Sequence, residues 1–290
     1  MPTVAERIGS GRFVSFELWP PRTVQSAAAL EEALERLTPL GPAFVAVTYG
    51  AGGSTRERTH DLVVRMVDSA LLPLAHLTCA AHHRYELVDV MQRYREAGVD
   101  NLLALHGDPP LAAAEELPEG DLRYARELVQ LARELGFPCV GVAVHPEGHP
   151  AATSREADRR HEARKLREAD FGLTQFFHRA EDYFALVDDL AARGATAPII
   201  PGVMPITNVR QVERMAAMSG TNIPLELAER LQSVADRPDE VRRIGVEHAT
   251  LLCRELLRGG APGLHFYTMN KAAATLEVCA NLGWETVGAR

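Results

Sequence analysis

The sequence predicts an α/β fold: a single (β/α)8 barrel of the TIM type with extra helices before the last strand. Short apolar runs alternate with amphipathic helical patterns along the whole chain. Most of these runs begin about thirty residues apart, which is the spacing of βα units. The length of 290 residues is also close to the roughly 250 residues of one such barrel. We therefore expect residues 1–290 to form one domain.

Eight segments have the continuous apolar character of parallel strands that are buried on both faces. In chain order they are Phe13–Glu17, Phe44–Thr48, Leu74–Thr78, Asn101–Leu105, Cys139–Val144, Gly172–Phe176, Pro198–Gly202 and Gly263–Tyr267. The first strand must end before Pro20 and Pro21, because proline has no N–H to donate to a sheet ladder.

Segments with apolar residues three and four positions apart separate the strands and predict amphipathic helices. They are Ser26–Leu37, Arg56–Ser69, Arg84–Ala97, Leu122–Leu135 and Ala180–Arg193, and the long interval before the last strand adds Asn208–Met218, Pro224–Val234 and Asp239–Leu257. An open Rossmann-type sheet is the weaker alternative, because no predicted strand is followed by a G-x-G-x-x-G turn.

The composition argues against several classes of protein. The net charge of −8 disfavours nucleic acid as the main partner. No apolar run approaches the roughly 18 residues of a membrane span, and the N-terminal residues have no apolar core of a secretory signal. The four cysteines are scattered without the spacing of metal ligands, which is typical of free thiols in a reducing compartment. We expect a cytoplasmic protein without a metal, a membrane or a nucleic acid as its ligand.

Polar residues follow most of the predicted strands, at the end where α/β barrels hold their active sites. They are Glu17, Thr48, His76 and Thr78, His106–Asp108, His145–His149, Thr174–Gln175 and Tyr267–Lys271. Each has a structural explanation when taken alone: Asp108 can cap a turn, and Gln175 can be a hydrogen-bonded core amide. Seven such groups at one end of a barrel favour an active site.

Glu17 is the most informative of these residues. It lies between Phe16 and Leu18 and close to Trp19, and desolvation by such neighbours raises the pKa of a carboxyl group. A carboxyl that stays protonated near neutral pH can serve as a general acid. The alternative is a surface glutamate beside a turn.

The segment Ser154–Leu166 predicts a helix that has hardly any apolar stripe. Asp158, His161 and Lys165 share one face of it, and Arg164 borders that face. A solvated helix face is the usual explanation of such charge. The alternative is a cationic ledge that holds a phosphate or pyrophosphate, with Asp158 accepting from a sugar hydroxyl.

Together these motifs resemble the methylenetetrahydrofolate reductases, the flavoprotein (β/α)8 barrels of one-carbon metabolism. The resemblance extends in order over nearly the whole chain. It rests on Ser15-Phe16-Glu17 with Pro20-Pro21-Arg22-Thr23, Val47-Thr48-Tyr49-Gly50-Ala51, His76-Leu77-Thr78-Cys79, Gly107-Asp108-Pro109, His149-Pro150, Thr174-Gln175-Phe176-Phe177, Ile200-Pro201-Gly202 and His265-Phe266-Tyr267-Thr268-Met269-Asn270.

The resemblance implies a reaction and a set of binding residues. NADH or NADPH reduces FAD and leaves, and 5,10-methylenetetrahydrofolate then takes its place and is reduced to 5-methyltetrahydrofolate. The residues implied for FAD are Thr48, His76, Leu105, His106, Gly107, Asp108, Ala143, His145, His149, Asp158, His161, Arg164 and Lys165. Those implied for the substrates are Glu17, Asp108, Gln175, Met215, Tyr267 and Lys271. Relatives assemble, so a homodimer or homotetramer is also expected.

The implied chemistry suits these residue types. Glu17 would give a proton to N10 as the folate ring opens, Asp108 would stabilise the cation that develops, and Gln175 would bind the pterin edge. Two positions depart from the family pattern: His106 stands where we expect arginine, and His145 where we expect tyrosine. In addition, Met215 aligns with an aromatic residue that supports the dinucleotide.

Two other functions remain open from the sequence. Eleven histidines in a barrel suggest a metal-dependent hydrolase with ligands drawn from His76, His106, Asp108, His145 and His178. Against it, the first strand lacks a His-x-His pair, and no helix carries histidines four positions apart. The second alternative is a non-catalytic barrel that binds folate or flavin as one subunit of a larger assembly.

Overall fold

The centre of the molecule is a sheet of nine parallel strands in the order β7-β6-β5-β4-β3-β2-β1-β9-β8. It is seen in a computed structural model that describes residues 2–50, 55–69, 71–107 and 120–284. The strands are β1 Val14–Leu18, β2 Val45–Val47, β3 Pro73–Thr78, β4 Asn101–Leu105, β5 Cys139–Val144, β6 Phe171–Thr174, β7 Ile199–Ile200, β8 Gly202–Val203 and β9 Leu264–Tyr267. Each predicted strand is therefore confirmed, with ends that differ by no more than two residues.

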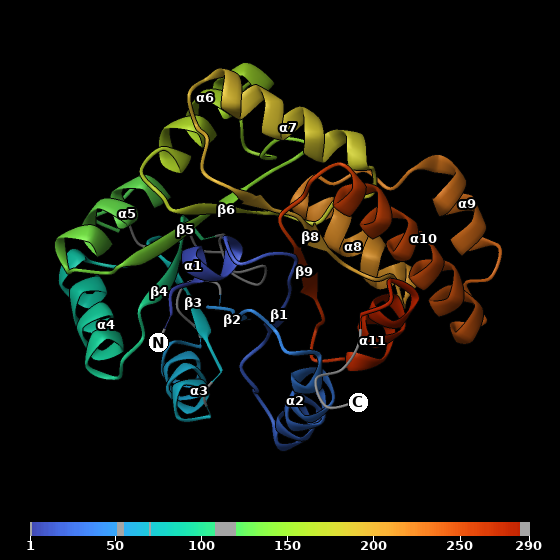
Figure 1. The fold of residues 1–290 in the computed structure, drawn as a ribbon, viewed down its shortest axis with the longest axis horizontal. Coiled ribbons are helices and arrows are strands. Elements are labelled where there is room, and N and C mark those ends of the chain that lie inside the picture. The colour runs from blue at the N-terminus through green and yellow to red at the C-terminus, as the bar shows by residue number, and fades with distance from the viewer. Residues whose placement is uncertain (1, 51–54, 70, 108–119, 285–290) are drawn as a thin grey trace.

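β7 and β8 are two parts of one strand, which Pro201 interrupts because it has no N–H to donate. The Pro201 carbonyl still accepts a hydrogen bond from the His265 N–H at 3.0 Å. β7 pairs with β6, and β8 pairs with β9. The chain itself thus closes the ring, and the predicted eight-stranded barrel is confirmed (Figure 1).

Helices surround this ring (Figure 1). They are α1 Val4–Ile8, α2 Val24–Leu37, α3 Arg56–Asp68, α4 Arg84–Glu96, α5 Ala125–Glu134, α6 Arg155–Leu166, α7 Ala180–Ala192, α8 Val209–Ser219, α9 Leu225–Gln232, α10 Pro238–Arg258 and α11 Ala272–Asn281, with a 3₁₀ turn at Thr38–Leu40. All predicted helices are present within a few residues. The sequence reasoning missed α1 and α11.

The N-terminal half of the barrel interior is apolar and is closed by α1. Phe44, Leu103 and Phe171 form one buried cluster with Val4 and Ile8 of α1. The Val4 N–H also donates to the Asn101 side chain at 2.7 Å. In Figure 1 α1 lies across the centre of the ring, so this end of the barrel is plugged.

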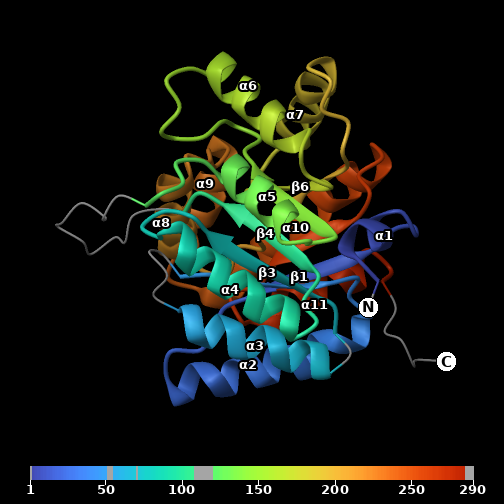
Figure 2. The same ribbon diagram turned by 90° about the vertical axis from the view of Figure 1, so that its left-hand side faces the viewer.

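The predicted extra helices α8, α9 and α10 pack together through a separate buried cluster, which includes Ile206 and Phe176. In Figure 2 the arrowheads of β3 and β4 point toward the side on which α8 and α9 lie, and α1 lies on the opposite side. The additional helices therefore stand at the C-terminal end of the strands. In the described residues, no helix is long and apolar enough to cross a membrane.

Candidate active site

Seven of the predicted site residues share the last inward-facing layer at the C-terminal end of the barrel. Side chains two positions apart on a strand face the same side. Leu74 and Leu103 belong to the interior cluster, so His76 and Leu105 also face inward. The same alternation directs seven predicted residues into this layer: Glu17, Thr48, His76, Leu105, Ala143, Gln175 and Tyr267. The structure therefore brings together residues that lie on seven strands or directly after them.

Glu17 is buried at this end, with 9% of its surface exposed. Burial raises the pKa of its carboxyl group to about 7, although a hydrogen bond from the Trp19 indole N–H at 3.3 Å acts in the opposite direction. Its backbone carbonyl accepts from the Thr268 hydroxyl at 2.7 Å. The carboxyl group can therefore be protonated near neutral pH.

His76 lies next to Glu17, with 3.9 Å between its Nε2 and Oε2 of the carboxyl group. Burial lowers the pKa of His76 to about 3, so the ring is neutral and carries one donor and one acceptor nitrogen. Within the described residues, His76 Nε2 and the Thr78 hydroxyl are buried and have no hydrogen-bond partner. Such atoms are costly unless a ligand or water satisfies them.

Two further polar contacts join strands at this layer and at the layer beneath it. The Ser15 hydroxyl lies 2.9 Å from His265 Nδ1, and the Tyr267 hydroxyl donates to the Thr174 carbonyl at 2.5 Å. Burial raises the pKa of Tyr267 well above its ordinary value, and the charge of Glu17 acts in the same direction. Tyr267 is thus a neutral hydrogen-bond donor that braces β9 against β6.

The loop after β9 has a backbone geometry that is rare outside glycine. Met269 and Asn270 both have positive φ angles, 53° and 57°. The Asn270 side chain accepts from the Trp19 N–H at 2.8 Å and donates to the Trp19 carbonyl at 2.9 Å. This two-way contact joins the loop to the residue that donates to Glu17, and strained turns of this kind are common at functional sites.

The remaining predicted substrate residues differ in how far they are buried. Gln175 is partly buried, and its Oε1 accepts from the Phe176 N–H at 3.0 Å. Lys271 is exposed at the start of α11, and Met215 is partly buried on α8. Asp108 lies outside the described residues.

The predicted ledge on α6 is partly buried rather than fully solvated. Asp158 is buried and accepts from the His149 N–H at 3.1 Å. Burial lowers the pKa of Lys165, while the charges of Glu162 and Asp158 oppose that shift. Arg164 is exposed, as is His161, whose ring stacks on Tyr124. These residues lie beside the loop that follows β5.

Comparison with known proteins identifies the family. A family model described as "Methylenetetrahydrofolate reductase" matches residues 4–283. The 5,10-methylenetetrahydrofolate reductase of Escherichia coli is 35% identical over 273 residues, which cover 93% of this chain and 90% of the relative. The chain belongs to the methylenetetrahydrofolate reductase family. The predictions of that family and of a reductase are confirmed.

Other members of the reductase family differ in length. "Methylenetetrahydrofolate reductase (NADH) 1" of Zea mays is 33% identical over 295 residues, which cover 97% of this chain and 50% of the relative. Among solved structures, a Clostridium thermocellum protein is described as binding 5-methyl-5,6,7,8-tetrahydrofolic acid. It superposes on this chain with a TM-score of 0.66 at 14% sequence identity, and the match covers 96% of this chain and 99% of that protein's chain. This last likeness shows the fold alone.

The described residues give no support to the metal-dependent hydrolase. Among them, no group of three or more histidine, cysteine, aspartate or glutamate side chains is arranged to hold a metal ion. His178 is buried beside His248 of α10, with 5.5 Å between the ring centroids. His106 is exposed.

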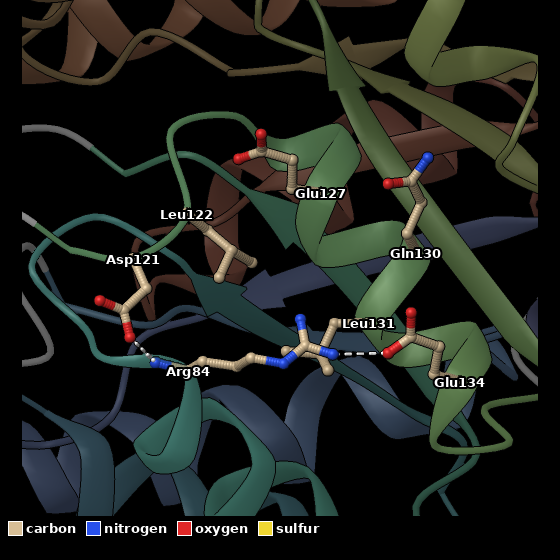
Figure 3. A pocket seen from close by; sticks show the side chains of 7 residues that line it. All are labelled: Arg84, Asp121, Leu122, Glu127, Gln130, Leu131 and Glu134. Atoms are coloured by element: carbon tan, nitrogen blue, oxygen red, sulfur yellow. Dashed lines mark hydrogen bonds and ion pairs between the residues drawn. The ribbon is translucent and has the colours of Figure 1, made fainter.

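A groove on the outside of this reductase barrel is separate from the site. It has a volume of about 430 Å³ and lies between α4 and α5 (Figure 3). Arg84 spans it, donating to Glu134 at 2.6 Å through its side chain and to Asp121 at 2.7 Å through its N–H. Glu134 is thus paired with Arg84, while Asp121 and Glu127 accept from backbone N–H groups, and none of the predicted site residues lines the groove.

Sequence reasoning missed two charged residues of α6 that contact the predicted flavin loop. Arg159 and Glu162 are each 1% exposed, and they bind each other and the backbone of His145. The only sequence signal was their separation of three positions on a helix, which is common on solvated faces.

Proposed function

We propose that this chain reduces 5,10-methylenetetrahydrofolate to 5-methyltetrahydrofolate with NADH, in a ping-pong reaction through bound FAD. The family and its NADH-named relatives support the substrate and the reductant. The observation that carries the catalytic part is Glu17: a carboxyl group with a pKa of about 7, held inside the C-terminal layer of the barrel.

The described residues fit a flavin. His76 Nε2 and the Thr78 hydroxyl are buried atoms without partners in the described chain, on the strand next to the β4 loop. Gly107 has a φ of +95°, and a Cβ there would come within 2.7 Å of Thr78 Cβ, so only glycine allows this close approach. FAD would be held by Thr48, His76, Leu105, His106, Gly107, Ala143, His145 and His149, and on α6 by Asp158, His161, Arg164 and Lys165. When bound, FAD supplies a ring that takes up and gives back a hydride.

The proton transfer is assigned to Glu17. The folate ring must open before it accepts a hydride, and N10 can depart only if it is protonated. Protonated Glu17 gives its proton to N10, and its burial keeps the carboxyl neutral until then. Neutral Tyr267 and neutral His76 surround the carboxyl without offering a competing charge.

The remaining residues bind and orient the substrates. Asp108, which lies outside the described residues, is proposed to stabilise the iminium cation that develops on the folate. Gln175 is proposed to bind the pterin edge through its amide, and Lys271 the acidic tail of the folate. Met215 is proposed to contact the nicotinamide dinucleotide from α8.

The test measures the two half-reactions separately by stopped-flow absorbance of the bound flavin. General acid catalysis is worth about 10²–10⁴-fold, so Glu17→Gln should slow the folate step at least about 10²-fold. Reduction by NADH should change little, because it needs no proton donor to a leaving nitrogen. The control is Glu35→Gln, which makes the same change at an exposed carboxylate on α2. Equal slowing of both steps would make Glu17 a positioning residue, and no slowing would make it structural.

We further propose that the chain works as one barrel domain and assembles as a homodimer or homotetramer in the cytoplasm. Its four cysteines are free and buried, which fits a reducing compartment. Analytical ultracentrifugation of the purified chain measures the assembly, and a monomer at micromolar concentration would refute it.

A further inference from the structure

Arg159 is the largest side chain that is fully buried in the described part of the chain, and it is charged. Its guanidinium group does not stay within its own helix. Nη1 donates to the His145 carbonyl at 2.8 Å and to Glu162 Oε2 at 2.6 Å, and Nη2 donates to the Pro146 carbonyl at 2.5 Å. One side chain of α6 thus binds two consecutive carbonyl groups of the loop after β5.

Glu162 completes the contact from the other side. Its Oε1 accepts from the His145 N–H at 2.5 Å and lies 3.3 Å from His145 Nδ1. Asp158 extends the set along the loop by accepting from the His149 N–H at 3.1 Å. Two turns of α6 therefore fix the backbone of the β5–α6 loop at four points.

A buried ion pair is a poor way to gain stability. Desolvation of both charges offsets their attraction, and apolar residues of similar size often give an equally or more stable protein. A pair that instead binds three backbone groups of one loop is better explained by the position that it imposes. Arg159 can impose it because its planar fork reaches two carbonyls at once, which a lysine cannot do.

The same contact selects one form of the His145 ring. Burial alone would raise the pKa of Glu162, but the hydrogen bond from His145 and the nearby charges of Lys165 and Arg159 bring it below its ordinary value. An ionised carboxylate only accepts hydrogen bonds, so Nδ1 of His145 must carry the proton. In the neutral ring Nε2 is then the acceptor. The His145 side chain keeps 16% of its surface exposed.

We propose that Arg159 and Glu162 are positioning residues of the cofactor site: they fix the His145–Pro146 backbone and hold His145 as the Nδ1–H tautomer. Nε2 of His145 then accepts from a hydroxyl or N–H donor of the bound flavin. The flavin contact rests on the proposed function, whereas the position and tautomer of His145 do not.

The first experiment examines the tautomer in the wild-type chain without added ligand. Long-range ¹H–¹⁵N spectra of the histidine rings distinguish Nδ1–H from Nε2–H, and His145→Gln assigns the signal by its loss. We expect Nδ1–H for His145. An Nε2–H ring would overturn the proposal whatever the chain binds, and this result needs no variant of the ion pair to fold.

The second experiment replaces the pair by apolar residues of similar volume, in the double variant Arg159→Met with Glu162→Leu. We expect it to unfold at a temperature no lower than the wild type, because both charges leave together. We also expect it to lose the Nδ1–H signature. Its dissociation constant for FAD, measured by flavin fluorescence, should rise about tenfold or more, as when supporting residues of a site are removed.

Arg160→Met is the matched control, since Arg160 is exposed on the same helix and pairs only loosely with Glu156 at 3.7 Å. It should keep wild-type tautomer, stability and FAD affinity. A double variant that binds FAD as tightly as the wild type would overturn the positioning role and leave the proposed function intact. Failure of the wild type itself to bind FAD would refute the flavin contact and the proposed function together, while the tautomer result still decides the rest.

Discussion

Burial raises the pKa of Glu17 to about 7, so its protonation changes within the range in which most enzymes are assayed. Only the protonated form can give a proton to N10. The rate of the folate step should therefore be level below about pH 6 and should fall roughly tenfold per pH unit above the pKa. Stopped-flow measurements of flavin reoxidation by folate between about pH 5.5 and 9 test this.

The NADH step serves as the internal control for this profile, because it does not use the Glu17 proton. It should lack the decline above neutrality that the folate step shows. A folate step that stays level to about pH 9 would remove Glu17 as the acid. A decline that persists unchanged in Glu17→Gln would assign it to another group.

Because its pKa is raised, Glu17 lowers the free energy of unfolding at alkaline pH. The native state holds the proton more tightly than the unfolded chain, whose glutamate has the ordinary value of 4.5. Its favourable contribution is full below that value and is lost as pH rises through about 7, at most about 3 kcal/mol for a shift of this size. Glu17→Gln should therefore raise the melting temperature at pH 8 relative to the wild type.

At about pH 4.5 that advantage should be absent, because the wild-type carboxyl is then protonated in the native protein. Differential scanning calorimetry of both proteins at the two pH values measures the difference. The same gain at both pH values would show that the substitution acts through packing. No gain at pH 8 would show that the carboxyl group is not desolvated.

Glu17 could be predicted from the sequence, whereas Arg159 and Glu162 could not. Glu17 ends a short apolar run that precedes two prolines, so local sequence predicts a carboxyl group at the end of a buried strand. Its observed neighbours His76 and Tyr267 come from other strands, β3 and β9. Arg159 is buried because the β5–α6 loop folds back over α6. The sequence around Arg159 does not predict the path of that loop. A highly charged helix is usually solvated, and here tertiary structure overrides that expectation.

At the scale of elements, α10 owes its position to a glycine. A Cβ at Gly245 would lie 1.9 Å from the Ile206 carbonyl oxygen, which is backbone and cannot move aside. Gly245→Ala should therefore destabilise the protein by about 2 kcal/mol or more and should displace α10 from the segment after β8. Urea unfolding measures the loss.

Gly9→Ala is the matched control for this prediction. Gly9 ends α1 with a right-handed φ of −74°, and an added Cβ would make only ordinary contacts at 3.7 Å. Its effect on the free energy of unfolding should stay within about 0.5 kcal/mol. If Gly245→Ala is equally mild, α10 can shift without cost, and the extra helices are not fixed by this contact.

The elements that the sequence did not predict are those with weak local patterns. α1 is only five residues long, and two of them are buried, so no period can be recognised. α11 has buried residues on much of its surface because it packs against α2 and α10. The strands were predicted because burial on both faces makes them continuously apolar. Their division at Pro201 follows from the missing N–H.

At the scale of the whole molecule, arginine joins successive helices around the barrel. Arg65 pairs with Glu31 between α3 and α2, Arg93 with Glu57 between α4 and α3, and Arg84 with Glu134 between α4 and α5. The series continues with Arg193–Glu156 and Arg242–Glu277. Composition alone shows that nearly all basic residues are arginine; their circular arrangement follows only from the fold.

Exposed pairs of this kind contribute little singly, about 0.2–1 kcal/mol each, and salt screens them. Glu31→Arg places two like charges between α2 and α3, so at low ionic strength it should lower the melting temperature. Adding Arg65→Glu restores opposite charges in reversed order and should recover most of the loss. In about 1 M NaCl, where the screening length is about 3 Å, the single and double variants should melt close together. Thermal unfolding of the four proteins at both salt concentrations completes the cycle. A deficit of Glu31→Arg that neither salt nor the second substitution removes would mean that Glu31 acts through packing, and that the ion pairs do not join the helices.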